Sequence, residues 1–356
     1  MRVRRRLWTV PVLAALVAGV VAVLPPPGPG AASAVAGSGA SGPAARGVVL
    51  AVHGGAGSAL RREDTGPEEE RAYRAGLADA LRAGQKVLRR GGSSVDAVEA
   101  AVRSLEDDPL FNAGKGAVFT EDAGHELDAS IMRGSDLATG AVAGVRGVRN
   151  PVSAARLVME RTKHVLLAGE GADDFAARSG LVPVTQDYFW TQRRWDELMK
   201  AKQPAGKRGR EGLTGTVGAV ALDRGRDLAA ATSTGGMTNK MAGRVGDSPV
   251  VGAGTYAQNG VVAVSATGQG ETFIRGAASA TIAHLVEFGG KDVTAAAHEV
   301  VMDRLTALGG KGGVIALDGR GTLAAPFSSE AMLHGYLTSD GRIVTRIFPD
   351  ESPGHD

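Results

Sequence analysis

The stretch Gly215-Thr216-Val217-Gly218-Ala219-Val220 marks a boundary in this chain of 356 residues, and the organisation of the chain follows from it. Residues 203–215, which lead up to the threonine, carry almost no apolar side chains and predict an exposed, mobile loop. The apolar run that continues to Asp223 predicts a buried strand. Thr216 therefore stands where a mobile polar loop meets a buried strand.

Two interpretations fit Thr216. The ordinary one is that a β-branched residue favours the start of a strand. The other is that the chain is cut before Thr216, which frees an α-amine with an ordinary pKa of about 7.7–8.0 beside its own hydroxyl. One residue would then supply both the nucleophile and the general base. This position by itself leaves both interpretations open.

The segments around this boundary predict an α/β protein. An apolar strand, 48–52, runs into His53-Gly54-Gly55-Ala56-Gly57. Two similar strand–turn–strand units, 218–230 and 313–325, have nearly continuous apolar residues, so both faces of their sheets should be covered. The spacing of apolar residues predicts helices over 68–90, 93–105, 152–160, 190–201, 274–288 and 294–308. Sheets between helical layers, in one domain, are the economical assembly.

The N-terminus has the pattern of a secretory signal. Arginines at positions 2 to 6 precede an apolar run and a small-residue cleavage site, which predicts a signal peptide over 1–34. The alternative is a single membrane anchor, although Pro11 interrupts the apolar run. Residues 35–46 are rich in Gly, Ser and Ala and predict a flexible linker. We therefore expect a secreted or extracytoplasmic protein with no stable membrane association after cleavage.

Composition excludes several classes of protein. The chain has no cysteine, so disulfides, Cys-ligated zinc, iron–sulfur clusters and thiol nucleophiles are ruled out. Residues 1–34 carry four arginines and no acid, so the rest of the chain is slightly acidic and gives no reason to expect nucleic-acid binding. A Gly-x-Gly-x-x-Gly pattern at 37–42 lies in the linker with no strand before it. We expect no cofactor for catalysis.

Three polar clusters follow Thr216. A hydroxyl cluster, Thr232-Ser233-Thr234, ends the returning strand. Arg244 and Asp247 place a cation and an anion in a glycine-rich turn, which suits the carboxylate and ammonium of an α-amino acid, although a surface ion pair would look the same. The turn that begins with Thr267 offers a further hydroxyl and backbone N–H groups that could stabilise an oxyanion. Together the clusters indicate a hydrolase for an amino-acid-like substrate.

At these segments the sequence resembles the plant-type asparaginase/isoaspartyl peptidase family of N-terminal-nucleophile hydrolases. The matching blocks extend from the His53–Gly57 stretch to Ala325-Pro326-Phe327, nearly the whole chain after the linker. The other matching blocks lie at 105–114, 215–220, 232–240 and 243–249. The longer blocks are specific, and the resemblance favours the cleaved form of Thr216.

The resemblance implies a four-layer αββα sandwich and autoproteolysis between Gly215 and Thr216. The products would be an α subunit, 47–215, and a β subunit, 216–356, of the same domain, assembled as a dimer of cleaved αβ units. The implied substrates are small molecules, L-asparagine and β-aspartyl (isoaspartyl) dipeptides, each hydrolysed to release L-aspartate.

Residue roles are carried over by position. Thr216 would be the nucleophile and Thr234 its hydrogen-bonding neighbour, while Thr267 and the amide of Gly268 would form the oxyanion hole. Other positions would hold the substrate or lie near the cleavage site: Arg244 for the carboxylate, Asp247 and the Gly270 carbonyl for the amine, and Asn112 near the cut. In family members the corresponding loop binds sodium through backbone carbonyls, supplied here by Leu105, Glu106, Asp108, Phe111, Ala113 and Lys115.

Two rival functions remain open. One is a glycosylasparaginase of the same superfamily, which we disfavour because that branch has asparagine where this chain has Gly235. The other is an inactive secreted protein that keeps the amino-acid pocket. An active enzyme would give two fragments split at Thr216 on a denaturing gel, whereas a binding protein would give one band.

Overall fold

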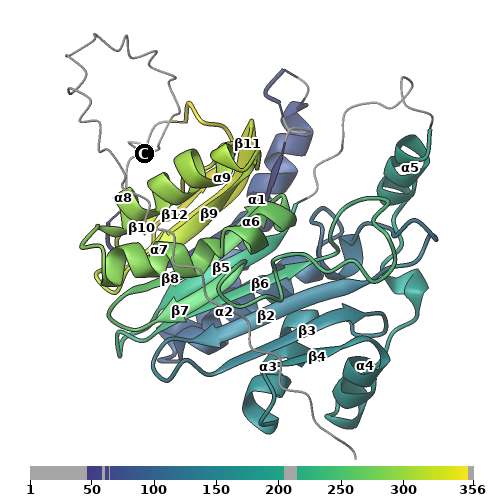
Figure 1. Ribbon diagram of the computed structural model, residues 1–356, viewed down its shortest axis with the longest axis horizontal. Coiled ribbons are helices and arrows are strands. Elements are labelled where there is room, and N and C mark those ends of the chain that lie inside the picture. The colour runs from purple at the N-terminus through teal and green to yellow at the C-terminus, as the bar shows by residue number, and fades with distance from the viewer. Residues whose placement is uncertain (1–45, 58–60, 64, 204–214, 352–356) are drawn as a thin grey trace, which may run out of the picture. The chain divides into compact units, whose positions relative to one another are not determined.

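The strands on either side of Thr216 interleave in one large sheet (Figure 1). The computed structural model describes residues 46–57, 61–63, 65–203 and 215–351, all within the unit Gly39–Asp356. The predicted signal peptide and all of the predicted linker except residue 46 lie outside these ranges, as do residues 204–214 of the predicted loop.

The first sheet has eight strands in the order β12-β11-β1-β5-β6-β2-β3-β4, and only the β3–β4 pair is parallel. Its strands are β1 (Val48–Gly57), β2 (Leu127–Arg133), β3 (Thr139–Val145), β4 (Leu166–Ala168), β5 (Val217–Leu222), β6 (Leu228–Thr234), β11 (Ala331–Thr338) and β12 (Ile343–Arg346). The second sheet is antiparallel, in the order β10-β9-β8-β7. Its strands are β7 (Thr255–Gln258), β8 (Val262–Gly268), β9 (Gly312–Leu317) and β10 (Leu323–Ala324).

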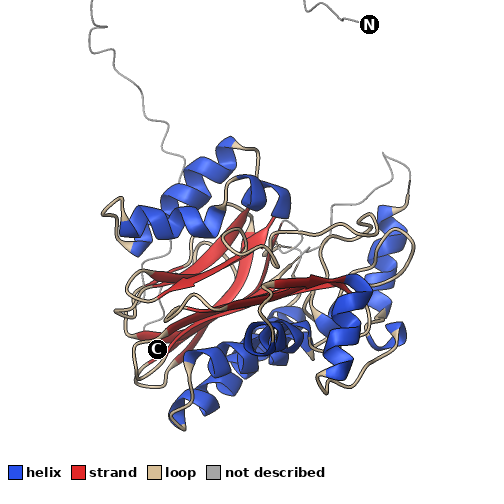
Figure 2. Cartoon of the chain, turned by 60° about the horizontal axis from the view of Figure 1, so that its bottom comes forward, coloured by secondary structure: helices blue, strands red, loops and turns tan. Residues whose placement is uncertain are grey.

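Helices cover the outer faces of both sheets, which completes the predicted four-layer αββα sandwich (Figure 2). Over the large sheet lie α1 (Pro67–Arg89), α2 (Ser94–Glu106) and α3 (Pro151–Arg161). Over the small sheet lie α6 (Gly270–Arg275), α7 (Ala278–Glu287), α8 (Val293–His298), the π-helix η3 (Glu299–Arg304) and α9 (Leu305–Ala307). The remaining helical segments are η1 (Gly114–Gly116), α4 (Gly169–Arg178), η2 (Gln186–Tyr188) and α5 (Gln192–Ala201).

The inner faces of the two sheets pack on each other through aliphatic side chains such as Val220, Ala263 and Ile315. Both faces of β5 are therefore buried, which is why its sequence reads as an unbroken apolar run. The two similar strand–turn–strand units form β5–β6 and β9–β10, but they belong to different sheets. Thr216 precedes β5 directly and so stands at one end of the sandwich.

The structure confirms the predicted helices except where a change of backbone conformation interrupts one of them. Ser93 caps α2 through a reciprocal capping box with Asp96, as the sequence indicates. The helix predicted over 274–288 is wrong as a single element, because Ala277 adopts a left-handed conformation that separates α6 from α7. The short helix α4 had no counterpart in the prediction. None of the helices within the described ranges has the length and hydropathy needed to cross a membrane.

Candidate active site

A histidine on β1, His53, contacts Thr216 at the point where the chain enters β5. Its side chain is buried, and His53 Nδ1 lies 2.7 Å from the Thr216 carbonyl oxygen. A carbonyl can only accept, so Nδ1 carries the proton. Burial lowers the pKa of His53 to about 3 and keeps the ring neutral, which leaves Nε2 as an acceptor for the Ser265 hydroxyl at 2.7 Å.

Threonines from two other strands converge on Thr216. Its Oγ1 donates to Thr234 Oγ1, at the end of β6, over 3.2 Å. Its backbone nitrogen donates to Thr267 Oγ1, near the end of β8, over 3.3 Å. Thr234 also accepts from Gly236 N at 2.9 Å, and Thr267 accepts from Ala56 N at 3.1 Å. The predicted hydroxyls therefore surround both the side chain and the nitrogen of Thr216. Gly268, the predicted oxyanion-hole amide, follows Thr267 as the last residue of β8.

Gly55 leaves the space that Gly215 occupies. A Cβ on Gly55 would lie 2.5 Å from Gly215 Cα, closer than packed atoms approach, and the φ of Gly55 is +125°, a value that favours glycine. The glycine run in β1 thus brings its backbone directly against the bond that precedes Thr216.

Asn112 reaches the site through the turn that follows β6. Its side chain donates to Gly236 O over 2.7 Å and accepts from Val118 N over 2.9 Å, while its carbonyl accepts from Gly235 N over 3.0 Å. Asn112 has no hydrogen bond to Thr216 among the described residues. It instead fixes the turn that carries Thr234.

The predicted substrate-binding residues meet beside this turn. A Cβ on Gly270 would lie 2.8 Å from Asp247 Oδ1 and 3.0 Å from Arg244 Nη2, so the three predicted positions adjoin one another. The ion pair of Arg244 is not with Asp247: its Nε and Nη2 are 3.0 and 2.9 Å from Glu271 Oε1. No sequence pattern predicts a role for Glu271.

Asp247 is a buried carboxyl with one oxygen, Oδ2, that has no partner among the described residues. Burial raises its pKa to about 7; Arg244 opposes the rise, whereas Glu271 and Asp128 add to it. A cationic ligand would supply the missing partner and favour the charged form.

Behind Thr216 the structure reveals a chain of buried hydroxyls that the sequence analysis missed. From His53 it continues through Ser265, Thr232 and Thr255 to Ser130, with oxygen–oxygen distances of 2.7, 2.6 and 2.8 Å between the hydroxyls. Because the Thr216 carbonyl fixes the tautomer of His53, each hydroxyl can donate toward it in turn. The only sequence signal was a set of hydroxyl residues inside strands that are otherwise apolar.

The predicted sodium loop curls at the C-terminus of α2. Two glycines of this loop leave no room for a side chain. A Cβ on Gly114 would overlap the carbonyl oxygen of Glu106, and a Cβ on Gly116 would overlap the carbonyl oxygen of Phe111. Among the described residues, the carbonyls of Asp108 and Ala113 each accept one local backbone N–H, which leaves a second lone pair on each. Neutral carbonyl oxygens suit a hard cation, so the donor set fits sodium. No cluster of three or more acidic or histidine side chains competes for a metal within the described ranges.

Glu106 has a second role through its side chain. Its Oε1 accepts from Ser233 Oγ at 2.6 Å and from Val152 N at 3.0 Å, so the carboxyl ties α2 and α3 to the residue before Thr234. Burial raises its pKa to about 8, although Ser233 and Val152 oppose the rise. The carboxyl is therefore largely protonated at neutral pH.

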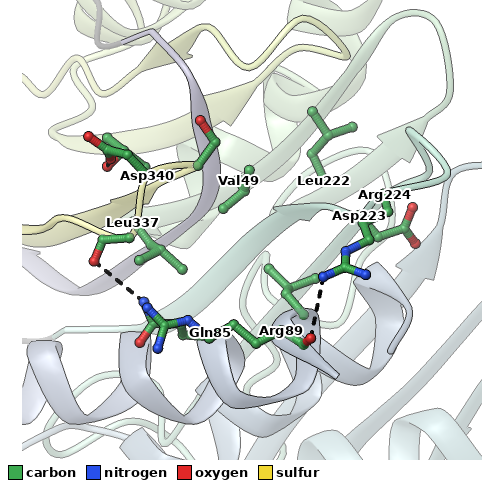
Figure 3. Close-up of a pocket in the computed structure, with 12 residues that line it drawn as sticks. Val49, Gln85, Arg89, Leu222, Asp223, Arg224, Leu337 and Asp340 are labelled. Atoms are coloured by element: carbon green, nitrogen blue, oxygen red, sulfur yellow. Dashed lines mark hydrogen bonds between the residues drawn. The ribbon is translucent and has the colours of Figure 1, made fainter. Parts of the chain in front are cut away.

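A cavity of about 260 Å³ lies at the other end of β5 and is a different place (Figure 3). Leu222 and Asp223 line it together with Gln85 and Arg89 from α1. Gln85 donates to the Gly341 carbonyl over 3.4 Å, and Arg224 donates to the Arg89 carbonyl over 3.4 Å. The whole length of β5 separates this cavity from Thr216.

A family model and several curated relatives match this chain over most of its length. A family model described as asparaginase matches residues 46–347, which include every predicted site residue. The isoaspartyl peptidase of Salmonella typhimurium is 52% identical over 309 residues, covering 84% of this chain and 98% of its own. The isoaspartyl peptidase of Escherichia coli is 52% identical over 318 residues, covering 85% and 97%. The isoaspartyl peptidase/L-asparaginase of Homo sapiens is 42% identical over 307 residues, covering 85% and 97%.

Proposed function

The chain belongs to the asparaginase family, and on this premise we propose that it hydrolyses isoaspartyl dipeptides and L-asparagine with Thr216 as an N-terminal nucleophile. The observation that carries the proposal is the convergence of Thr234 and Thr267 on the hydroxyl and the nitrogen of Thr216. A strand-starting threonine with a structural role alone would not need both groups met by further hydroxyls.

The chemistry uses both ends of Thr216. Its Oγ attacks the side-chain amide carbon of asparagine, or the isopeptide carbon of a β-aspartyl dipeptide. The α-amine takes the hydroxyl proton and passes it to the leaving group, so that ammonia or an amino acid departs and a β-aspartyl ester remains on Thr216. Water then cleaves the ester, and aspartate is released with the Thr216 hydroxyl restored.

The neighbours of Thr216 have matching tasks. Thr234 accepts from the nucleophile hydroxyl and so orients it. Thr267 accepts two N–H groups, which leaves its own O–H to donate to the oxyanion beside the amide of Gly268. Arg244 receives the substrate α-carboxylate, and the ionised Asp247 receives the α-ammonium together with the Gly270 carbonyl.

Maturation would supply the amine. We propose that the chain cuts itself between Gly215 and Thr216, where Gly55 packs on the residue before the bond. The loop carbonyls from Leu105 to Lys115 would hold a sodium ion, which would fix the loop that carries Asn112. The mature form would be a dimer of cleaved αβ units, and residues 1–34 would direct it out of the cytoplasm before they are removed.

The decisive experiment compares T216A with T216S. T216A lacks the hydroxyl and should remain one uncut chain without activity. T216S keeps both hydroxyl and amine and should yield two fragments with residual activity, so it controls for folding. N-terminal sequencing of the smaller fragment should begin at Thr216 in the wild type. A T216A protein that is cut and active would refute the assignment.

Substrate preference needs a separate measurement. Release of aspartate from β-aspartyl dipeptides should exceed release from glycosylated asparagine. The opposite order would favour the glycosylasparaginase, and an uncut wild-type chain that binds L-aspartate without turnover would favour an inactive binding protein.

A further inference from the structure

Lys240 is a buried cation to which neither the sequence nor the reaction assigns a task. The residue is 5% exposed, and its Nζ donates to the Glu126 carbonyl at 2.7 Å. Within the part of the chain that the structure describes, this ammonium forms no ion pair. A buried lysine is rarely left without an anionic partner, so the position needs an explanation.

The ammonium faces the free end of Arg244. A Cβ on Gly236 would lie 3.0 Å from Lys240 Nζ and 3.3 Å from Arg244 Nη1, so both cationic groups border the same space above the Gly236 backbone. Glu271 occupies Nε and Nη2 of Arg244. Nη1 has no hydrogen-bond partner among the described residues, and it borders the same Cβ position of Gly236 as Lys240 Nζ.

The charges around Lys240 leave room for an anion. Asp128 and Glu126 favour its charged form, but from beyond ion-pair distance, and Arg244 opposes it. Burial lowers the pKa of Lys240 for the same reason that it penalises any ammonium away from water. A carboxylate bound between Nζ and Nη1 would neutralise both cations and offset that penalty.

We propose that Lys240 is a second cationic ligand for the substrate α-carboxylate, acting together with Arg244. This inference rests on the proposed function, in which Arg244 receives that carboxylate. A side chain on Gly236 would displace Lys240, because its Cβ would lie 2.9 Å from Lys240 Cδ, and the φ of Gly236, +85°, also favours glycine. The pair restricts the site to substrates with a free α-carboxylate, since a neutral α-amide would leave two buried cations without a counter-charge.

The test separates charge recognition from folding. In K240M, KM for L-asparagine should rise roughly tenfold to a hundredfold, the usual range for a lost charge-assisted hydrogen bond, while kcat changes little. The inhibition constant of L-aspartate should rise by the same factor. The inhibition constant of the α-amide of L-aspartate, which lacks the α-carboxylate, should stay within about twofold of the wild type.

Two further variants sharpen the comparison. K240Q keeps a donor for the Glu126 carbonyl but lacks the charge, so it should behave like K240M. K291M removes an ammonium that pairs with Glu299 on the outer helical layer, and it should match the wild type in every constant. Self-cleavage, followed on a denaturing gel, should be unchanged in all three variants because it involves no α-carboxylate.

Each other outcome counts against the proposal. Equal losses of affinity for aspartate and its α-amide would show a structural role, and unchanged constants would show no role. If neither Lys240 variant cleaved itself, Lys240 would be required for folding, before substrate is present. A wild-type protein that hydrolyses neither asparagine nor β-aspartyl dipeptides would refute the proposed function itself, independently of any variant.

Discussion

Asp247 combines a buried carboxyl with a proposed task that needs its negative charge. Burial raises its pKa to about 7, so the free enzyme carries a largely neutral Asp247 below that pH. A neutral carboxyl cannot pair with the substrate ammonium. We therefore expect kcat/KM for L-asparagine to fall toward tenfold per pH unit as the pH drops below about 7, mainly through KM.

The E271Q variant distinguishes the titration of Asp247 from that of the Thr216 amine, whose ordinary pKa of about 7.7–8.0 lies in a similar pH range. Because the charge of Glu271 raises the pKa of Asp247, its removal should move the acid limb of the profile to lower pH. E299Q, whose carboxylate pairs with Arg304 far from the site, should leave the limb in place. A limb that does not move in E271Q would show that Asp247 does not set it.

Gly55 should be required for maturation. In G55A the new methyl group would lie 2.5 Å from Gly215 Cα, on a backbone whose φ of +125° already disfavours a side chain. We expect self-cleavage to slow by at least tenfold, measured as the fraction of cut chain against time. G91A also places alanine at a positive φ, +80°, but in open space, and should mature at the wild-type rate.

Among the elements, the C-terminus of α2 joins the predicted sodium loop to the site. Glu106 supplies a carbonyl to the loop and a carboxyl to Ser233, the neighbour of Thr234. The same helix end thus lies against Gly114 of the loop and holds Ser233 near the end of β6. Movement of this helix would displace Thr234 relative to Thr216.

The pH dependence of stability should report the Glu106 carboxyl. Its pKa is raised from 4.5 to about 8 on folding, so its contribution is fully present below about pH 4.5 and is lost as the pH rises to about 8. The slope within this window is at most about 1.4 kcal/mol per pH unit. In the uncut T216A background, E106Q should flatten the dependence, measured by denaturant unfolding at several pH values. An unchanged slope would contradict the assignment.

For the molecule as a whole, a cut before Thr216 would not separate the chain into two independent fragments. The segment before the cut supplies β1 and the β2-β3-β4 edge, and the segment after it supplies β5, β6, β11 and β12 of the same sheet. Three of the strand pairings, β11–β1, β1–β5 and β6–β2, therefore join one segment to the other.

The two fragments should consequently remain together under native conditions. We expect them to co-elute from a sizing column after maturation and to separate only in denaturant. Light scattering on the same peak gives the mass and tests the proposed dimer of αβ units. Separation of the fragments without denaturant would contradict the sheet order.

How much of this the sequence predicts depends on the range of the interaction. The capping box of α2 involves residues three apart, and the buried strand β5 is an unbroken apolar run, so both could be predicted from neighbours in the chain. The break between α6 and α7 could not be placed in this way, because Gly276 stands beside it but the residue that adopts the left-handed conformation is Ala277, a residue type that rarely does so. Arg244 could be assigned to a substrate site from its sequence position. Its ion pair with Glu271 could not be predicted, because β7 and β8 separate the loop of Arg244 from helix α6 along the chain.

Most of the helices, the strands before and after Thr216, and the place of Thr216 between a polar loop and a buried strand could be predicted from the sequence. The groups that meet at Thr216 could not be predicted in this way: His53 on its carbonyl, Thr234 on its hydroxyl and Thr267 on its nitrogen are brought together by the fold. Local patterns record burial and backbone preference, which depend on near neighbours. A hydrogen bond across 163 residues depends on sheet order and register, which are settled only when β1 pairs with β5 in the folded sheet.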